Sequence, residues 1–89
     1  GGQVHIQESR REGAHVVAAS GRLDMATADG FRDVLLPRLE QAAASSLRLV
    51  LDFTRLDYIS SAGLRVLMLA SKQARASGAR LAIAGLQPV

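Results

Sequence analysis

The chain has 89 residues, of which 48% are hydrophobic and 21% are charged. Its length allows a single domain, and its apolar content excludes an intrinsically disordered chain. The absence of cysteine excludes disulfides and thiolate chemistry, and the net charge of +3 comes from scattered arginines, without the single basic face typical of nucleic-acid-binding proteins.

The first twenty-four residues predict a hairpin of two antiparallel strands. Residues 4–7 alternate weakly, which favours a strand near a sheet edge. A turn follows at 10–13 and ends on a glycine. The second strand is expected over 14–20, and the Gly-Arg-Leu-Asp run at 21–24 is expected to close it.

A helix is predicted next, because apolar residues recur every three or four positions from 28 to 42. Thr27 is the expected N-cap, and Asp29 lies in the first turn, where the helix dipole favours an acid. Pro37 removes a backbone hydrogen bond inside this helix. We therefore expect a kink around Pro37. The predicted buried face consists of Ala28, Phe31, Val34, Leu35, Leu39 and Ala42.

The second half of the chain repeats the strand-helix alternation. Residues 47–53 are apolar nearly throughout, as in a central strand covered on both faces. We expect a loop at 54–57, a short extended piece at 58–59 and a helix from Ser61 to a stop at Gly78. The predicted face of that helix contains Leu64, Leu67, Met68, Ser71 and Ala74. A last strand is expected over 81–84.

These elements predict an α/β fold with the order β-β-α-β-α-β. A helix between consecutive strands implies parallel pairing after the first hairpin, and so a mixed sheet covered by two helices. No segment predicts a membrane span, because the longest apolar run covers only residues 66–70. The N-terminus also lacks the pattern of a secretion signal. We expect a cytoplasmic protein with no membrane contact, no direct nucleic-acid binding and no cofactor.

The candidate chemistry lies at Ser60 and Ser61, at the entrance of the second helix. Either serine can cap exposed backbone N–H groups. The same N–H groups and the helix dipole also favour an anion, such as a phosphate carried by Ser61. Spacing alone leaves the capping role and the modification site both open.

Two other kinds of site are weaker alternatives. A serine hydrolase would have Ser61 as its nucleophile, but Ile59 occupies the first glycine position of the G-x-S-x-G elbow. The only histidines, His5 and His15, fall in the first hairpin, and their spacing matches no common metal site. A divalent ion could also be held by acidic side chains near the loop at 54–57, although turn chemistry and capping explain them better. Those acidic residues are Asp24, Asp52 and Asp57.

The residues 49–54 and 56–64, Leu-Val-Leu-Asp-Phe-Thr and Leu-Asp-Tyr-Ile-Ser-Ser-Ala-Gly-Leu, resemble the signature of the STAS domain of bacterial anti-sigma factor antagonists. The run at 21–24 is similar to the Gly-x-Leu-Asp turn of that family. The resemblance extends from Val4 to Leu86 and implies one STAS-like domain over 3–89, with the first two glycines as additions from cloning. It also implies a protein that is not an enzyme.

The resemblance implies a switch. In this family the unmodified domain binds an anti-sigma factor that is also a serine kinase, and the sigma factor is released. Phosphorylation at the start of the second helix then ends the binding, and a phosphatase resets the cycle. Aligned on Gly63, the phosphoserine of the family falls on Ser61. Ser60 is the rival acceptor, because it replaces the acid that many members carry there.

The resemblance also implies a partner-binding surface around the acceptor, which comprises Asp24, Asp57, Ser60, Ala62, Gly63 and Arg65. Arg22 and Arg55 join Arg65 in an exposed rim that either defines docking or is ordinarily solvated. Family members usually continue into another helix after the last strand. That C-terminal helix is expected to be missing here, and the apolar surface it would leave bare could pair with a second copy. The alternative function is a non-catalytic subunit of a lipid or anion transport system.

Overall fold

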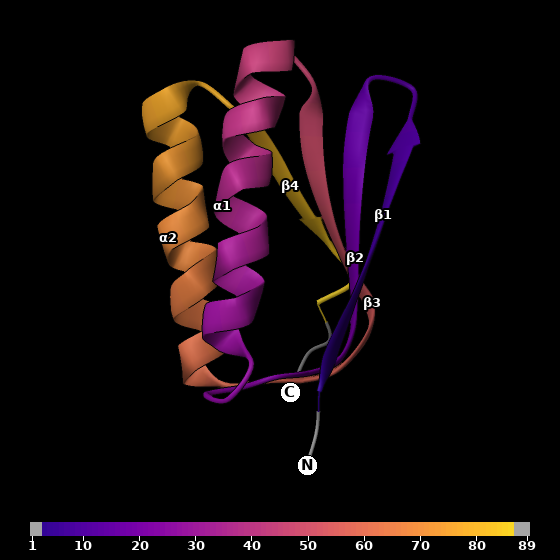
Figure 1. Cartoon of the computed structure of the whole chain (residues 1–89), viewed down its shortest axis with the longest axis vertical. Coiled ribbons are helices and arrows are strands. Elements are labelled where there is room, and N and C mark those ends of the chain that lie inside the picture. The colour runs from indigo at the N-terminus through magenta and orange to yellow at the C-terminus, as the bar shows by residue number, and fades with distance from the viewer. Residues whose placement is uncertain (1–2, 87–89) are drawn as a thin grey trace.

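A computed structural model, which describes residues 3–86, contains four strands and two helices in the predicted order β-β-α-β-α-β (Figure 1). The strands and helices are β1 Val4–Arg11, β2 Ala14–Leu23, α1 Ala28–Ser45, β3 Arg48–Ile59, α2 Ser61–Ser77 and β4 Arg80–Ala84. Within residues 3–86 no helix is long and apolar enough to cross a membrane.

The strands form one mixed sheet in the order β1-β2-β3-β4. β1 and β2 are antiparallel, whereas β3 is parallel to both β2 and β4. Each parallel pair is joined by a helix, and both helices lie on the same side of the sheet (Figure 1). As a result, both helices begin at the end of the sheet where β2 and β3 finish.

The core lies between the helices and one face of the sheet. Leu49, Leu51 and Phe53 of β3 are fully buried under the helices, and the ring of Phe53 packs against Phe31 of α1 at 5.9 Å between centroids. Val50, which alternates with them, is only half-buried. The expectation that this strand is covered on both faces is therefore wrong, because neither helix crosses to the second face.

The strand β3 continues through residues 54–57, where a loop was predicted. Leu56 pairs with Gly21, and Ile59 pairs with Leu23, so parallel pairing with β2 supplies the backbone hydrogen bonds. The register shifts between Ala18 and Ser20 and again between Gly21 and Arg22, and at each shift β3 advances by one residue more than β2. The Gly-Arg-Leu-Asp run consequently lies mostly inside β2, and the chain turns only after Leu23.

The first helix runs unbroken from Ala28 to Ser45 through Pro37. Pro37 is exposed, so its missing N–H leaves the carbonyl of Asp33 open to water instead of burying it unpaired. The helix ends on Ser46, which has a left-handed conformation with φ 57°, and the Leu47 N–H donates to the carbonyl of Ala42 at 3.0 Å.

The second helix buries a different face from the predicted one. Leu67 and Ala74 are buried as expected, but Leu64 is 46% exposed and Met68 is 67% exposed. Small residues lie against the rest of the fold instead, including Gly63 and Ala70. They allow the helix backbone to approach closely, which turns the flank with Leu64 and Met68 outward.

Candidate functional site

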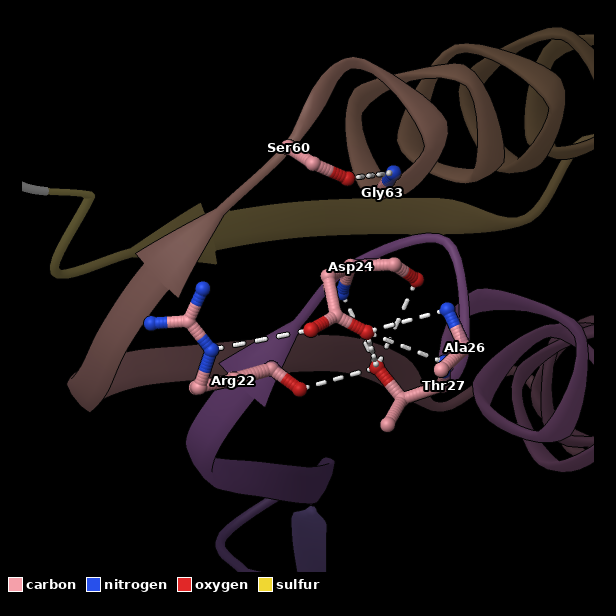
Figure 2. A network of polar contacts seen from close by, with 6 residues as sticks. All are labelled: Arg22, Asp24, Ala26, Thr27, Ser60 and Gly63. Carbon is pink, nitrogen blue, oxygen red and sulfur yellow. Dashed lines mark hydrogen bonds and ion pairs between the residues drawn. The ribbon is translucent and has the colours of Figure 1, made fainter. Parts of the chain in front are cut away.

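The two serines occupy different places at the start of α2. Ser60 is the N-cap, with an extended backbone at φ −93° and ψ 176°, and its hydroxyl oxygen accepts from the Gly63 N–H at 3.4 Å (Figure 2). Its own N–H donates to the carbonyl of Leu23 at 2.9 Å. Ser60 is half-buried. It thus fixes the end of β2 to the start of α2.

Ser61 is the first residue of α2 and is exposed. Across residues 3–86 its side chain has no hydrogen-bond partner. The first turn of α2 contains no acidic residue, so no side chain there offsets the partial positive charge of the helix end. The Ser61 hydroxyl is therefore accessible and stands in a field that favours added negative charge.

Gly63 lies in the interior, where α2 crosses the end of the sheet. A Cβ built on it would lie 2.9 Å from side-chain carbons of Leu23 and Ile59, and 3.0 Å from the Leu23 carbonyl oxygen. Only a residue without a side chain fits this close approach. Of the predicted partner-binding residues, Gly63 is buried and Ala62 is half-buried, whereas Arg65 is exposed.

Asp24 belongs to a polar network at the start of α1 (Figure 2). Its Oδ1 accepts from the N–H groups of Ala26 at 3.0 Å and Thr27 at 3.2 Å. Thr27 occupies the predicted N-cap position, but its side chain makes no cap bond. Its hydroxyl accepts from the Asp24 N–H at 2.9 Å and donates to the carbonyl of Arg22 at 2.8 Å. The Asp24 carboxylate therefore accepts from N–H groups of the turn that precedes α1, and the Thr27 hydroxyl holds the same turn.

Among residues 3–86, no ion pair joins the other charged residues predicted around the site, Arg22, Arg55, Asp57 and Arg65, to one another. The Arg22 guanidinium lies 4.2 Å from the centroid of the Tyr58 ring, and its Nε is 3.6 Å from the Asp24 carboxylate. Asp57 and Arg55 are exposed on β3. Arg65 lies on α2. The predicted arginine rim is thus distributed over three elements, with Arg22 already engaged within the fold.

A groove of about 330 Å³ opens between α1 and α2, and its lining reaches Ala62, the residue after Ser61. Apolar side chains from both helices and from the loop before α1 line it, together with one acidic residue and two arginines. The lining includes Met25, Asp29, Arg32, Ala62, Arg65 and Leu69. Sequence reasoning missed Met25 and Leu69. The sequence signal that could have identified Met25 is its position in a polar turn, outside every apolar repeat. In the structure the Met25 side chain is 85% exposed.

The residues weighed for metal binding or hydrolysis do not converge. Within residues 3–86 no three His, Asp or Glu side chains form a cluster that could hold a metal ion. Asp52 accepts from the N–H of Thr54 at 3.0 Å and from its hydroxyl, which lowers the pKa of that carboxyl. His15 lies at the far end of β2 from Ser61, and its Nε2 is 2.7 Å from Glu8.

Glu8 is the centre of a second polar cluster, on the hairpin. Its carboxylate accepts hydrogen bonds from Arg38 Nε at 2.6 Å and from a second guanidinium nitrogen of Arg38 at 3.1 Å. The ring nitrogen Nε2 of His15 lies 2.7 Å from the same carboxylate. The hydrogen bonds from Arg38 and His15 lower the pKa of Glu8 from 4.5 to about 2. This cluster ties β1 and β2 to α1 and has a structural role.

Comparison with known proteins relates most of this chain to a known family. The family model described as Mlab, STAS domain matches residues 6–89. A putative anti-sigma factor antagonist of Bordetella bronchiseptica, BtrV, is 36% identical over 77 residues, which are 86% of this chain and 64% of the relative. The chain thus spans somewhat less than two thirds of that relative.

Solved structures share the fold. An anti-sigma factor antagonist from Mycobacterium paratuberculosis has 25% identity and a TM-score of 0.66, over 79% of this chain and 57% of its own. SpoIIAA, an anti-sigma factor antagonist, matches in unphosphorylated form with 17% identity and a TM-score of 0.68, over 94% and 76% of the two chains. The phosphorylated form of SpoIIAA, described as a Bacillus cell fate determinant, matches with 18% identity and a TM-score of 0.60, over 86% and 68%.

Proposed function

Because this chain belongs to the STAS domain family, we propose that it is an anti-sigma factor antagonist controlled by phosphorylation of Ser61. In the unmodified state it binds an anti-sigma factor that is also a serine kinase, and the sigma factor is released. The observation that carries the proposal is the exposed hydroxyl of Ser61 at the start of α2, which has no hydrogen-bond partner among residues 3–86. The relationship to BtrV supports the same role.

The geometry favours Ser61 over Ser60 as the acceptor. The Ser60 hydroxyl is half-buried and holds the cap bond to Gly63, so modifying it would disturb the start of α2. The Ser61 hydroxyl can reach a kinase without breaking any such bond. In the reaction its oxygen forms a bond to the γ-phosphorus of ATP, the bond from that phosphorus to the β-phosphate oxygen breaks, and the hydroxyl proton passes to a base of the kinase.

A phosphate on Ser61 would change binding more than folding. It adds a charge of about −1.5 to −2 at pH 7. The N-terminus of α2 stabilises this charge in the free domain, but an interface that had enclosed a neutral hydroxyl would now have to bury it. Asp24 follows Leu23, whose carbonyl is bonded to Ser60, and adds a second negative charge nearby. Phosphorylation therefore favours dissociation.

The test is phosphorylation and binding measured together. Wild type, Ser61→Ala and Ser60→Ala are incubated with ATP and purified candidate serine kinases of the same genome, and each product is analysed by intact mass and peptide mapping. We expect one phosphate on Ser61 and loss of kinase binding once it is attached. If phosphate is found on Ser60 alone, control by phosphorylation stands and the acceptor is Ser60 instead of Ser61.

The contrary result is equally specific. If no kinase phosphorylates or binds the wild-type chain, while a transporter ATPase or permease forms a stable complex with it, the anti-sigma proposal fails. The chain would then act as a non-catalytic subunit of a lipid or anion transport system. Turnover of an activated ester that Ser61→Ala abolishes would instead show an enzyme.

A further inference from the structure

The groove between α1 and α2 has an apolar interior beside an unpaired positive charge. Leu69 is 43% exposed and Met25 is 85% exposed, and both line the groove. Arg32 is engaged by Asp29 and Asp33, each at 3.4 Å. Arg65 forms no ion pair with any residue of the part that the structure describes. The groove is therefore complementary to a ligand that presents an apolar group next to a negatively charged group.

The position of the groove connects it to the modification site. Ala62, which lines it, directly follows Ser61, and Arg65 lies four residues after Ser61 on α2. Side chains at this spacing are neighbours on one helix face. The N-terminal turns of both parallel helices meet here (Figure 1), and only α1 has an acid in its first turn.

Building on the proposed function, we propose that this groove receives a segment of the partner kinase that presents an apolar side chain next to a carboxylate. The apolar side chain packs between Met25 and Leu69, and the carboxylate pairs with Arg65. Charge complementarity carries the choice of occupant, because an apolar segment without an acid would leave Arg65 desolvated and unpaired. The volume of about 330 Å³ suits one anchoring side chain better than a long peptide.

The groove also explains how phosphorylation reaches the interface. A phosphate on Ser61 lies within reach of the Arg65 guanidinium and pairs with it in a charge-assisted hydrogen bond. The partner's carboxylate then loses its cation and meets a negative charge instead. Arg65 is thus a positioning residue that the partner and the phosphate compete for.

The chain supplies matched controls for this inference. Leu64 and Leu69 lie on the same helix with nearly equal exposure, 46% and 43%, but only Leu69 lines the groove. Lys72 is an exposed cation of α2 that does not line the groove, and so is the counterpart of Arg65. The variants are therefore Leu69→Asp and Arg65→Glu, with Leu64→Asp and Lys72→Glu as controls.

The experiment measures the dissociation constant of each variant for the purified kinase that binds the wild type, by isothermal titration calorimetry. We expect Leu69→Asp and Arg65→Glu each to weaken binding by about tenfold or more, as for an interface anchor, while each control stays within about threefold. The phosphomimetic Ser61→Asp should weaken binding less in an Arg65→Gln background than in the wild type. Circular dichroism checks that each variant is folded.

The outcomes separate this inference from the proposed function. If the wild type binds the kinase and loses binding on phosphorylation, but both groove variants bind within about threefold of it, the groove is not the docking site and the proposed function stands. Equal weakening by Leu64→Asp would also overturn the inference. If Leu69→Asp fails to fold, Met25→Asp replaces it, because Met25 lies in a turn outside the helices and strands.

Discussion

Gly63 and Leu23 are in direct contact across the junction of α2 and β2, and no side chain would fit between them. A Cβ on Gly63 would lie 2.9 Å from Cγ of Leu23, which is fully buried. The Ser60 N–H and the Leu23 carbonyl form a hydrogen bond of 2.9 Å at the same junction. The position of the candidate acceptor Ser61 therefore depends on how closely α2 approaches the sheet.

Gly63→Ala should destabilise the fold and shift the start of α2. The added methyl group collides with Leu23 and Ile59, and overpacking of this kind costs about 1–3 kcal/mol. Gly30→Ala is the matched control, because Gly30 lies in α1 and nothing is within 4 Å of a Cβ there. That variant should gain roughly 0.5–1 kcal/mol from helix propensity. Urea denaturation measures both, and equal effects would contradict the packing argument.

Replacing Asp24 should separate its structural role from any role in partner binding. Asp24→Ala removes the acceptor of the Ala26 and Thr27 N–H groups and should lower the free energy of unfolding by about 1 kcal/mol. Asp24→Asn keeps an oxygen acceptor without the charge and should be less costly. If Asp24→Asn is stable and binds the kinase normally, the Asp24 side chain acts only to hold the turn before α1. Chemical denaturation and titration calorimetry give the two values.

The two serines should differ in stability when each is replaced by alanine. Ser60→Ala removes the cap of α2 and should cost about 0.5–2 kcal/mol. Ser61→Ala removes an exposed hydroxyl that has no partner in the described part of the chain, residues 3–86, and should stay within about 0.5 kcal/mol of the wild type. Thermal unfolding compares the pair. A larger cost for Ser61→Ala would mean that Ser61 is the true cap and would weaken its assignment as acceptor.

The hairpin cluster should make stability depend on acid pH. The folded state lowers the pKa of Glu8 from 4.5 to about 2 through hydrogen bonds from Arg38 and His15. The ionised carboxylate therefore stabilises the fold fully above pH 4.5, and this contribution is lost as the pH falls through that range toward 2. Because the cluster is partly exposed, we expect a contribution of about 1 kcal/mol after solvent screening.

Denaturation between pH 2 and 6 tests this contribution with Glu8→Gln and Glu12→Gln. Glu8→Gln should lower stability at pH 6 and should flatten the pH dependence, since the titrating group is gone. Glu12 is exposed in the turn between β1 and β2 and forms no ion pair with any residue from 3 to 86. Its variant should follow the wild-type curve. Identical curves for all three proteins would show that the pair with Arg38 has no net effect on stability.

Local sequence pattern determined much of the fold. The spacing of Phe31, Leu35 and Leu39 identified the buried face of α1 correctly, because that helix packs its apolar stripe directly on the sheet. The central strand was recognised from Leu49 to Phe53 for a similar reason. The strand-helix alternation then implied parallel pairing, which the structure has.

Polar stretches were misjudged where the deciding contact was distant in sequence. Residues 54–57 resemble a loop, yet they extend β3 because residues of β2 supply their backbone partners. There the local preference is worth less than the hydrogen bonds that the tertiary structure makes available.

At the candidate site, the sequence by itself determined that two serines precede a helix and that a glycine follows them. It could not distinguish the serine that caps from the serine that is free, since either fits the pattern. Only the tertiary structure decided this, by pairing Ser60 with Leu23 and leaving Ser61 in solvent. The groove with Met25 and Leu69 was likewise decided by packing, because periodicity shows which face is apolar but not which neighbour will cover it.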